Sequence, residues 1–131
     1  MKKKAALVAR LILGLLFFVF GLNGFLQFIP APPGIPEAAM KFSGALVETG
    51  YFFPVLKGTE TICGLLLLTN IAAPLALVIL APIMIQIFLF HFFLTPGAQN
   101  VAMPIFMIIL HVTAASGYWH LYRPLFARRA Q

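Results

Sequence analysis

Long apolar runs separated by short polar segments dominate the pattern of this chain. An α-helix needs about 20 mainly apolar residues to cross the roughly 30 Å hydrocarbon core of a bilayer. Four runs meet this requirement, and the predicted spans cover residues 7–29, 51–68, 74–94 and 101–122. With short links between the spans, the pattern predicts an all-α integral membrane protein: an antiparallel four-helix bundle that forms a single domain over residues 1–131.

The segment between the first two runs has a different pattern. Residues 37–49 mix apolar side chains such as Met40 and Phe42 with charged ones such as Lys41 and Glu48, and prolines precede the segment. It is too short and too polar to span a bilayer. We therefore expect a short helix over residues 37–49 that lies in the membrane interface.

Composition and charge support a membrane location. Of the 131 residues, 62% are hydrophobic and 9% are charged, which is more apolar material than a soluble domain of this size can bury. The net charge of +6 comes mainly from basic residues near the two chain ends, an arrangement that favours a topology signal over nucleic-acid binding. The positive-inside rule then places both termini in the cytoplasm. The first run is too long for a signal peptide, so we expect it to be retained as a span.

Several polar side chains fall within the predicted spans, where a charge at the centre costs about 2.5 to 3.5 kcal/mol. Counting about 1.5 Å of rise per residue from the span ends places these side chains in the outer half of the membrane. They are Asn23, Lys57, Glu60, Gln86, His91 and His111. Their common level predicts a candidate polar pocket to which all four helices contribute.

Simpler explanations compete with this pocket. Lys57 and Glu60 are three residues apart, so they share a helix face and can neutralise each other. The alternative makes Glu60 a functional carboxylate tuned by Lys57, by burial and by His111. Gln86 and His91 are about 140° apart around one helix. Both can face the pocket only if a proline kink re-aims them, and no catalytic residue is assigned.

Cofactor chemistry is only weakly indicated. The three histidines lack bis-histidine haem spacing, because His120 falls near the cytoplasmic surface, and no metal site is predicted. The single Cys63 cannot form an internal disulfide and is expected to be a small core residue. The phenylalanine-rich runs 17–20 and 88–93 are core or lipid-facing material, or line a pocket for a quinone.

Gly14, Gly21 and Gly24 form a bare strip on the first span. Such a strip lets another helix approach closely. The approaching helix is either one of this chain or a helix of a partner protein.

Two motifs resemble those of the DoxX family of small membrane proteins. The first is Arg-x-x-x-Gly-x-x-Phe, found here from Arg10 to Phe17, and the second is Glu-x-x-x-Gly-x-x-Leu, found from Glu60 to Leu67. Asn23-Gly24 stands where the family often has a lysine, so the first span lacks that positive charge and Lys57 is its candidate replacement.

The resemblance implies a four-span bundle in the bacterial inner membrane. Members of the family are associated with a thiosulfate:quinone oxidoreductase and with a membrane complex that handles thiol and superoxide stress. More distant relatives act as assembly factors or cargo receptors. Of the pocket residues, only Glu60 matches a recognisable family position.

Three functions follow, and whether the protein is an enzyme stays open. The first is a membrane subunit of an oxidoreductase system, with soluble or membrane oxidoreductase partners. The second is a non-enzymatic protein that binds a lipid or small molecule or assists membrane-protein assembly. The third, a proton-coupled transporter, would need a homo-oligomer to build a pathway, because four spans without an internal repeat are too few.

Overall fold

The computed structural model describes residues 2–26, 34–95 and 97–127. Within these ranges the chain is helical and has no strand. The helices are α1 (Lys2–Leu26), α2 (Glu37–Glu48), α3 (Phe52–Thr69), α4 (Ala73–Leu94), α5 (Ala98–Ser116), α6 (Trp119–Tyr122) and the 3₁₀ turn η1 (Arg123–Phe126). Four of them, α1, α3, α4 and α5, are long and apolar enough to cross a membrane.

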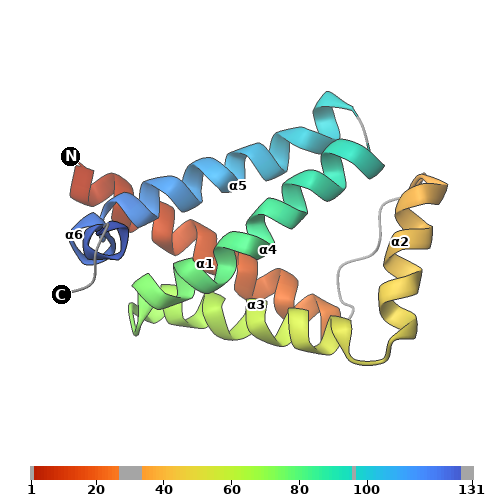
Figure 1. Ribbon diagram of the computed structural model, residues 1–131, viewed down its shortest axis with the longest axis horizontal. Coiled ribbons are helices and arrows are strands. Elements are labelled where there is room, and N and C mark those ends of the chain that lie inside the picture. The colour runs from red at the N-terminus through yellow and green to blue at the C-terminus, as the bar shows by residue number, and fades with distance from the viewer. Residues whose placement is uncertain (1, 27–33, 96, 128–131) are drawn as a thin grey trace.

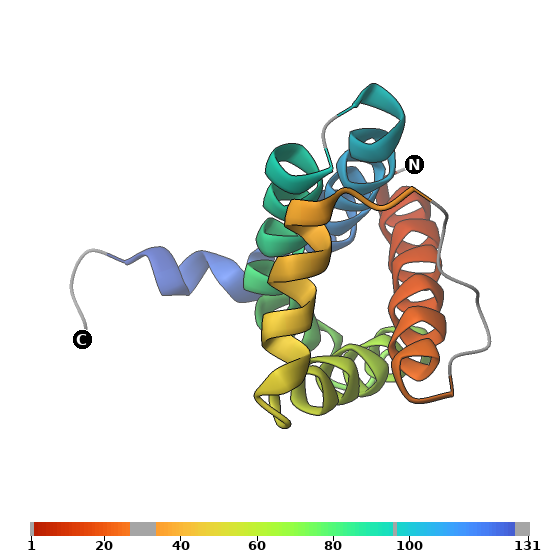
Figure 2. The same ribbon diagram turned by 90° about the vertical axis from the view of Figure 1, so that its right-hand side faces the viewer.

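The long helices carry the chain back and forth between two ends of the molecule (Figure 1). At one end, here called the α6 end, lie the start of α1, the turn between α3 and α4, and α6. At the other, the α2 end, α2 lies across the ends of the long helices (Figure 2). Ala39 of α2 is buried, and Phe42 packs on Phe90 of α4 with ring centroids 5.9 Å apart.

Glycines bring the backbones of α1 and α3 together. A Cβ on Gly14 would lie 3.0 Å from the carbonyl oxygen of Gly64, and a Cβ on Gly64 would lie 2.7 Å from that of Gly14. A Cβ on Gly21 would lie 2.6 Å from the backbone nitrogen of Thr61. Side chains at these positions would force the helices apart, so the glycine strip predicted from the sequence is occupied by α3 rather than left open for a partner.

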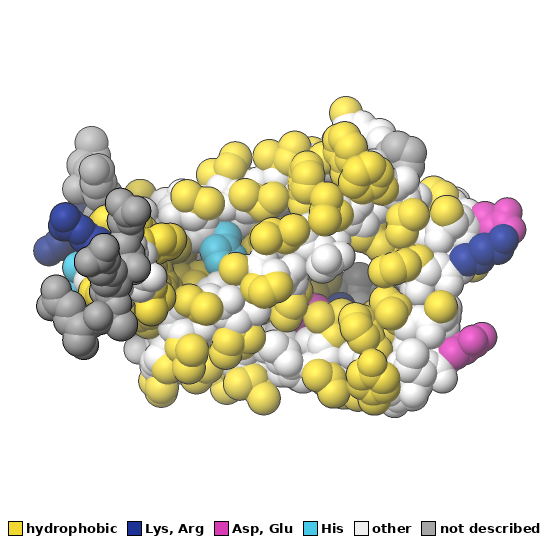
Figure 3. Space-filling view, viewed as in Figure 1, with side chains coloured by type: hydrophobic (Ala, Val, Ile, Leu, Met, Phe, Trp, Pro, Cys, Tyr) yellow, Lys and Arg dark blue, Asp and Glu magenta, His cyan; other side chains and the backbone are white. Residues whose placement is uncertain are grey.

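The core lies where α1, α3, α4 and α5 meet. The largest fully buried side chains include Leu13 and Phe17 of α1, Leu67 of α3, and Leu77 and Leu80 of α4. Many other large apolar side chains of the long helices stay exposed. They cover most of the face in Figure 3, while charged side chains gather mainly at its two ends.

α3 and α4 agree with the predicted spans 51–68 and 74–94 to within one residue at each end. α1 begins at Lys2, before the predicted start at residue 7. The fourth span differs at both ends. That span was expected to continue to Tyr122, but α5 stops at Ser116. Tight 3₁₀-type bonds then close the turn, from Gly117 N to Ala114 O and from Tyr118 N to Ala115 O, and α6 leaves in a new direction (Figure 2). The predicted end of the first span, residues 27–29, lies outside the described residues.

The close contact of α1 with α3 predicts a position-specific sensitivity to alanine. Gly64→Ala should lower the free energy of unfolding by about 1 to 3 kcal/mol, because the added methyl group overpacks a backbone contact. Gly44→Ala in α2 is the control, since a Cβ there meets nothing within 4 Å. Thermal unfolding in detergent should show unchanged or slightly higher stability for this control. A Gly64→Ala protein as stable as the wild type would contradict the described packing.

Candidate functional site

Lys57 and Glu60 form a buried ion pair on α3. The Lys57 ammonium lies 3.5 Å from Glu60 Oε1, and the two side chains are 24% and 4% exposed. The missing side chain at Gly24 leaves room for the aliphatic stem of Lys57 to pack against α1. The pair predicted from the i, i+3 spacing is therefore present, and α1 covers it. Asn23, the neighbour of Gly24, is half-buried on the same part of α1.

The two candidates on α4 do not point to a shared centre. Gln86 is exposed. His91 is half-buried and uses its Nδ1 for a 2.8 Å hydrogen bond with the carbonyl oxygen of Ile87, one turn earlier in its own helix. Its imidazole also packs edge-on against Phe90, with ring centroids 5.4 Å apart.

His111 lies apart from the Lys57–Glu60 pair. Its Nε2 donates a 3.0 Å hydrogen bond to the carbonyl oxygen of Leu77, near the start of α4. Five residues remain in α5 after His111, so it lies about 7 to 8 Å from the α6 end, whereas Glu60 lies about 13 Å from the end of α3 there. The expectation that His111 shares the level of Glu60 is therefore wrong, because α5 begins and ends earlier in the sequence than the predicted span.

His111 instead contributes to an apolar groove of about 560 Å³. Its walls come from α4, α5, α6 and η1 and include Leu77, Val112, Ala115, Trp119, Tyr122 and Phe126. Because a carbonyl only accepts hydrogen bonds, Nε2 of His111 carries the proton, and in a neutral ring Nδ1 carries a lone pair. Among the described residues, Nδ1 is the buried side-chain polar atom that has no hydrogen-bond partner.

Two tyrosine hydroxyls fasten the segment that follows α5, and Tyr122, the second of these residues, also lines this groove. Tyr122 donates a 2.6 Å hydrogen bond to the carbonyl oxygen of Pro74, and Tyr118 donates one of 2.6 Å to Asn70 Oδ1. Burial, with a smaller contribution from Tyr118, raises the pKa of Tyr122 to about 12. The hydroxyl of Tyr122 therefore keeps its proton, and its ability to donate, over the whole neutral range.

Arg10 is the functional candidate that sequence reasoning missed. The residue is only 8% exposed, and its Nη1 donates a hydrogen bond to the carbonyl oxygen of Leu67. The last carbonyls of a helix lack partners within the helix and carry partial negative charge. The Arg10 guanidinium of α1 satisfies one of these carbonyls at the end of α3. The sequence pattern of one helix cannot reveal this contact between two helices.

Metal and thiol chemistry find little support in the described part of the chain. No group of three or more His, Cys, Asp or Glu side chains there could hold a metal ion. Cys63 is a buried free thiol in the core, as expected. We found no match to this protein among protein-family models, curated proteins or solved structures.

The buried ion pair predicts a stability loss for Glu60→Gln. Removing one partner of a fully buried pair costs about 3 to 5 kcal/mol. A loss nearer 2 kcal/mol is expected here because Lys57 is partly exposed and can be partly solvated. Glu37→Gln, which removes the exposed Lys41–Glu37 pair of α2, should leave the thermal unfolding curve unchanged. Equal curves for both variants would show that the buried pair adds nothing to stability.

The Tyr122 hydroxyl predicts a pH-dependent contribution to stability. Tyr122→Phe should cost about 1 kcal/mol through loss of the bond to Pro74, whereas Tyr51→Phe, at an exposed position, should cost little. Because the folded-state pKa of Tyr122 is raised to about 12, its contribution is fully present below about pH 10, the ordinary tyrosine pKa. It is lost as the pH rises through 12. Melting temperatures of wild type and Tyr122→Phe should therefore converge at high pH, and a constant difference would refute this assignment.

Proposed function

We propose that this protein is a DoxX-like, four-span protein of the bacterial inner membrane that binds a lipid-soluble ligand with a polar head. In this arrangement α1, α3, α4 and α5 cross the bilayer as an antiparallel bundle and α2 lies in the outer interface. The exposed apolar side chains of the long helices support it, as does the basic character of the α6 end, which carries Lys3, Lys4 and Arg123. The positive-inside rule makes that end cytoplasmic.

The apolar groove beside His111 is the observation that carries the ligand proposal. Its volume of about 560 Å³ falls within the range of about 300 to 1,000 Å³ typical of small-molecule sites. Its lining is almost wholly apolar, with His111, Ser116 and Tyr122 as the polar exceptions. Such a composition suits a hydrophobic ring or chain that carries one or two hydrogen-bonding groups.

The chemistry of His111 favours a ligand that donates a hydrogen bond. Nε2 is committed to Leu77, so the lone pair at Nδ1 is the group left to be satisfied. A buried polar atom without a partner costs about 1 to 3 kcal/mol, and a hydroxyl group that reached it would recover part of that loss. A quinol has an apolar body and ring hydroxyls and meets both requirements.

Binding a quinol in the membrane is the role expected of a membrane subunit or partner of an oxidoreductase system. The resemblance to DoxX proteins points in the same direction. The competing role in assembly, with a partner helix on the glycine strip, loses its support because α3 already fills the strip.

Blocking the groove tests this proposal. Decylubiquinol should bind the purified protein in nanodiscs, and Val112→Trp should weaken binding at least tenfold because the indole occupies the groove. Ile109→Trp is the matched control: it is equally exposed on the same helix, one turn earlier, and does not line the groove. Isothermal titration gives the dissociation constants. Equal binding by the two variants would rule the groove out as the site.

The role of His111 has its own readout. Decylubiquinol should bind about fivefold more tightly than decylubiquinone, because only the reduced form donates to Nδ1. His111→Ala should remove this preference and lower the amount of quinone-type ligand that copurifies, as mass spectrometry of native extracts measures. His120→Ala, at an exposed position, should change neither. A preference that survives His111→Ala would contradict the assigned hydrogen bond.

A further inference from the structure

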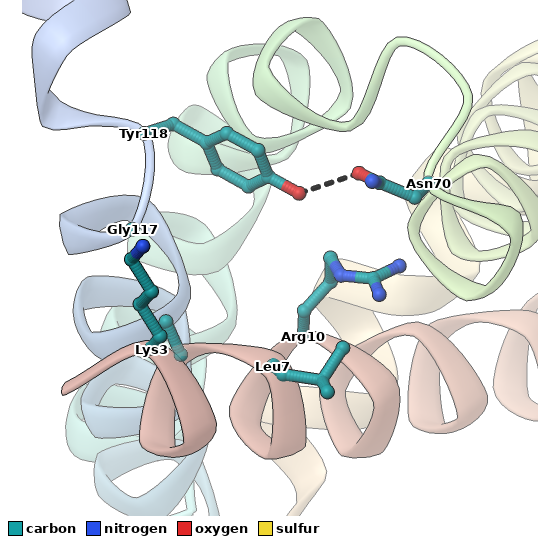
Figure 4. Close-up of a pocket in the computed structure, with 7 residues that line it drawn as sticks. Lys3, Leu7, Arg10, Asn70, Gly117 and Tyr118 are labelled. Atoms are coloured by element: carbon teal, nitrogen blue, oxygen red, sulfur yellow. Dashed lines mark hydrogen bonds between the residues drawn. The ribbon is translucent and has the colours of Figure 1, made fainter. Parts of the chain in front are cut away.

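A second cavity, of about 170 Å³, lies at the α6 end on the other side of the corner between α5 and α6. Lys3, Leu7 and Arg10 of α1 form one wall, and Asn70, Gly117 and Tyr118 complete it. Figure 4 shows the Lys3 and Arg10 side chains rising from α1 toward Tyr118 and Asn70. Residues 3, 7 and 10 share one face of a helix, so the wall follows from the sequence spacing once α1 is in place.

The cavity carries positive charge without a carboxylate to balance it. Two of its lining side chains are cationic. The sequence contains three acidic residues in all: Glu37 and Glu48 belong to α2 at the opposite end, and Glu60 is paired with Lys57. No side-chain carboxylate of the chain is therefore available to balance Lys3 and Arg10 at the cavity, and their combined charge attracts an anion there.

The polar groups around the cavity are held in place before any ligand arrives. Arg10 is fixed by the bond from Nη1 to the carbonyl oxygen of Leu67, and its remaining N–H groups have no protein partner in the described ranges. Tyr118 donates to Asn70 Oδ1, which orients the Asn70 side chain at the rim (Figure 4). Gly117 keeps this wall close, because a Cβ there would lie 2.8 Å from that of Ala6.

We propose that this cavity binds a phosphate group. An arginine guanidinium matches two phosphate oxygens with parallel N–H groups, and a nearby lysine adds a mobile point charge. The volume is several times the roughly 30 Å³ that one water molecule occupies in the liquid, so the group fits together with some of its hydration. The phosphate belongs either to the headgroup of an anionic lipid or to a soluble phosphate.

A purely structural role for Arg10 explains less. Capping the end of α3 accounts for one N–H group of Arg10 and for its burial. Capping α3 does not explain why Lys3 also lines the cavity, or why there is a cavity between Lys3 and Arg10. This site is separate from the groove beside His111 and stands whether or not that groove binds a quinol.

Native mass spectrometry with added phosphatidylglycerol tests the site on the full chain. The wild type should retain one tightly bound lipid. Lys3→Gln should weaken its retention about fivefold, as expected for one lost charge near a phosphate, and Arg10→Gln should weaken it further. Lys4→Gln is the matched control: the residue is exposed and adjacent in sequence but does not line the cavity, so retention should not change.

The outcomes separate the two phosphate sources and the rival explanation. Displacement of the lipid by millimolar inorganic phosphate upholds the site and assigns it to soluble phosphate, whereas lipid that resists displacement upholds it as a headgroup site. Equal weakening by Lys3→Gln and Lys4→Gln would show only diffuse attraction to a basic terminus and overturn the proposal. Absence of any retained lipid, together with no thermal shift in phosphate, would overturn it as well. If Arg10→Gln fails to fold, the comparison of Lys3 with Lys4 still decides.

Discussion

The close approach of α1 and α3 is the contact on which the other features depend. Gly14 and Gly64 face each other with no side chain between the backbones. This short separation brings Arg10 within reach of the last carbonyls of α3 and lets α1 cover the Lys57–Glu60 pair. Side chains at the two glycines would move both polar arrangements apart, because interiors this closely packed do not absorb an added methyl group without displacement.

The same contact gives a physical reason for the two motifs that resemble the DoxX family. Along the antiparallel course of α1 and α3, Gly14 meets Gly64, and Arg10 donates to Leu67. Phe17 is buried, and Glu60 of the second motif is held by Lys57. The motif residues thus serve mainly one interface, in which small residues permit contact and polar residues satisfy helix ends and each other. They specify how two helices pack, and they do not by themselves specify a reaction.

The α6 end concentrates the features that suggest ligand binding. Tyr118 and Tyr122 tie the segment after α5 to the turn between α3 and α4. An apolar groove lies on one side of this segment and a basic cavity on the other. The groove suits the apolar tail or ring of a lipid-soluble molecule, whereas the basic cavity suits a phosphate group. The two sites therefore suit two ligands at the end of the protein proposed to face the cytoplasm.

The sequence alone predicted what depends on short-range order: the apolar runs, the helix over residues 37–49 and the pairing of Lys57 with Glu60. These follow from helix length and from i, i+3 spacing, which hold in any tertiary context. Tertiary structure decided the rest. Gln86 turned outward, His111 bonded to Leu77 and lay away from Glu60, and Arg10 was buried against Leu67. Each outcome depends on how neighbouring helices are placed against one another, which the pattern of a single helix does not encode.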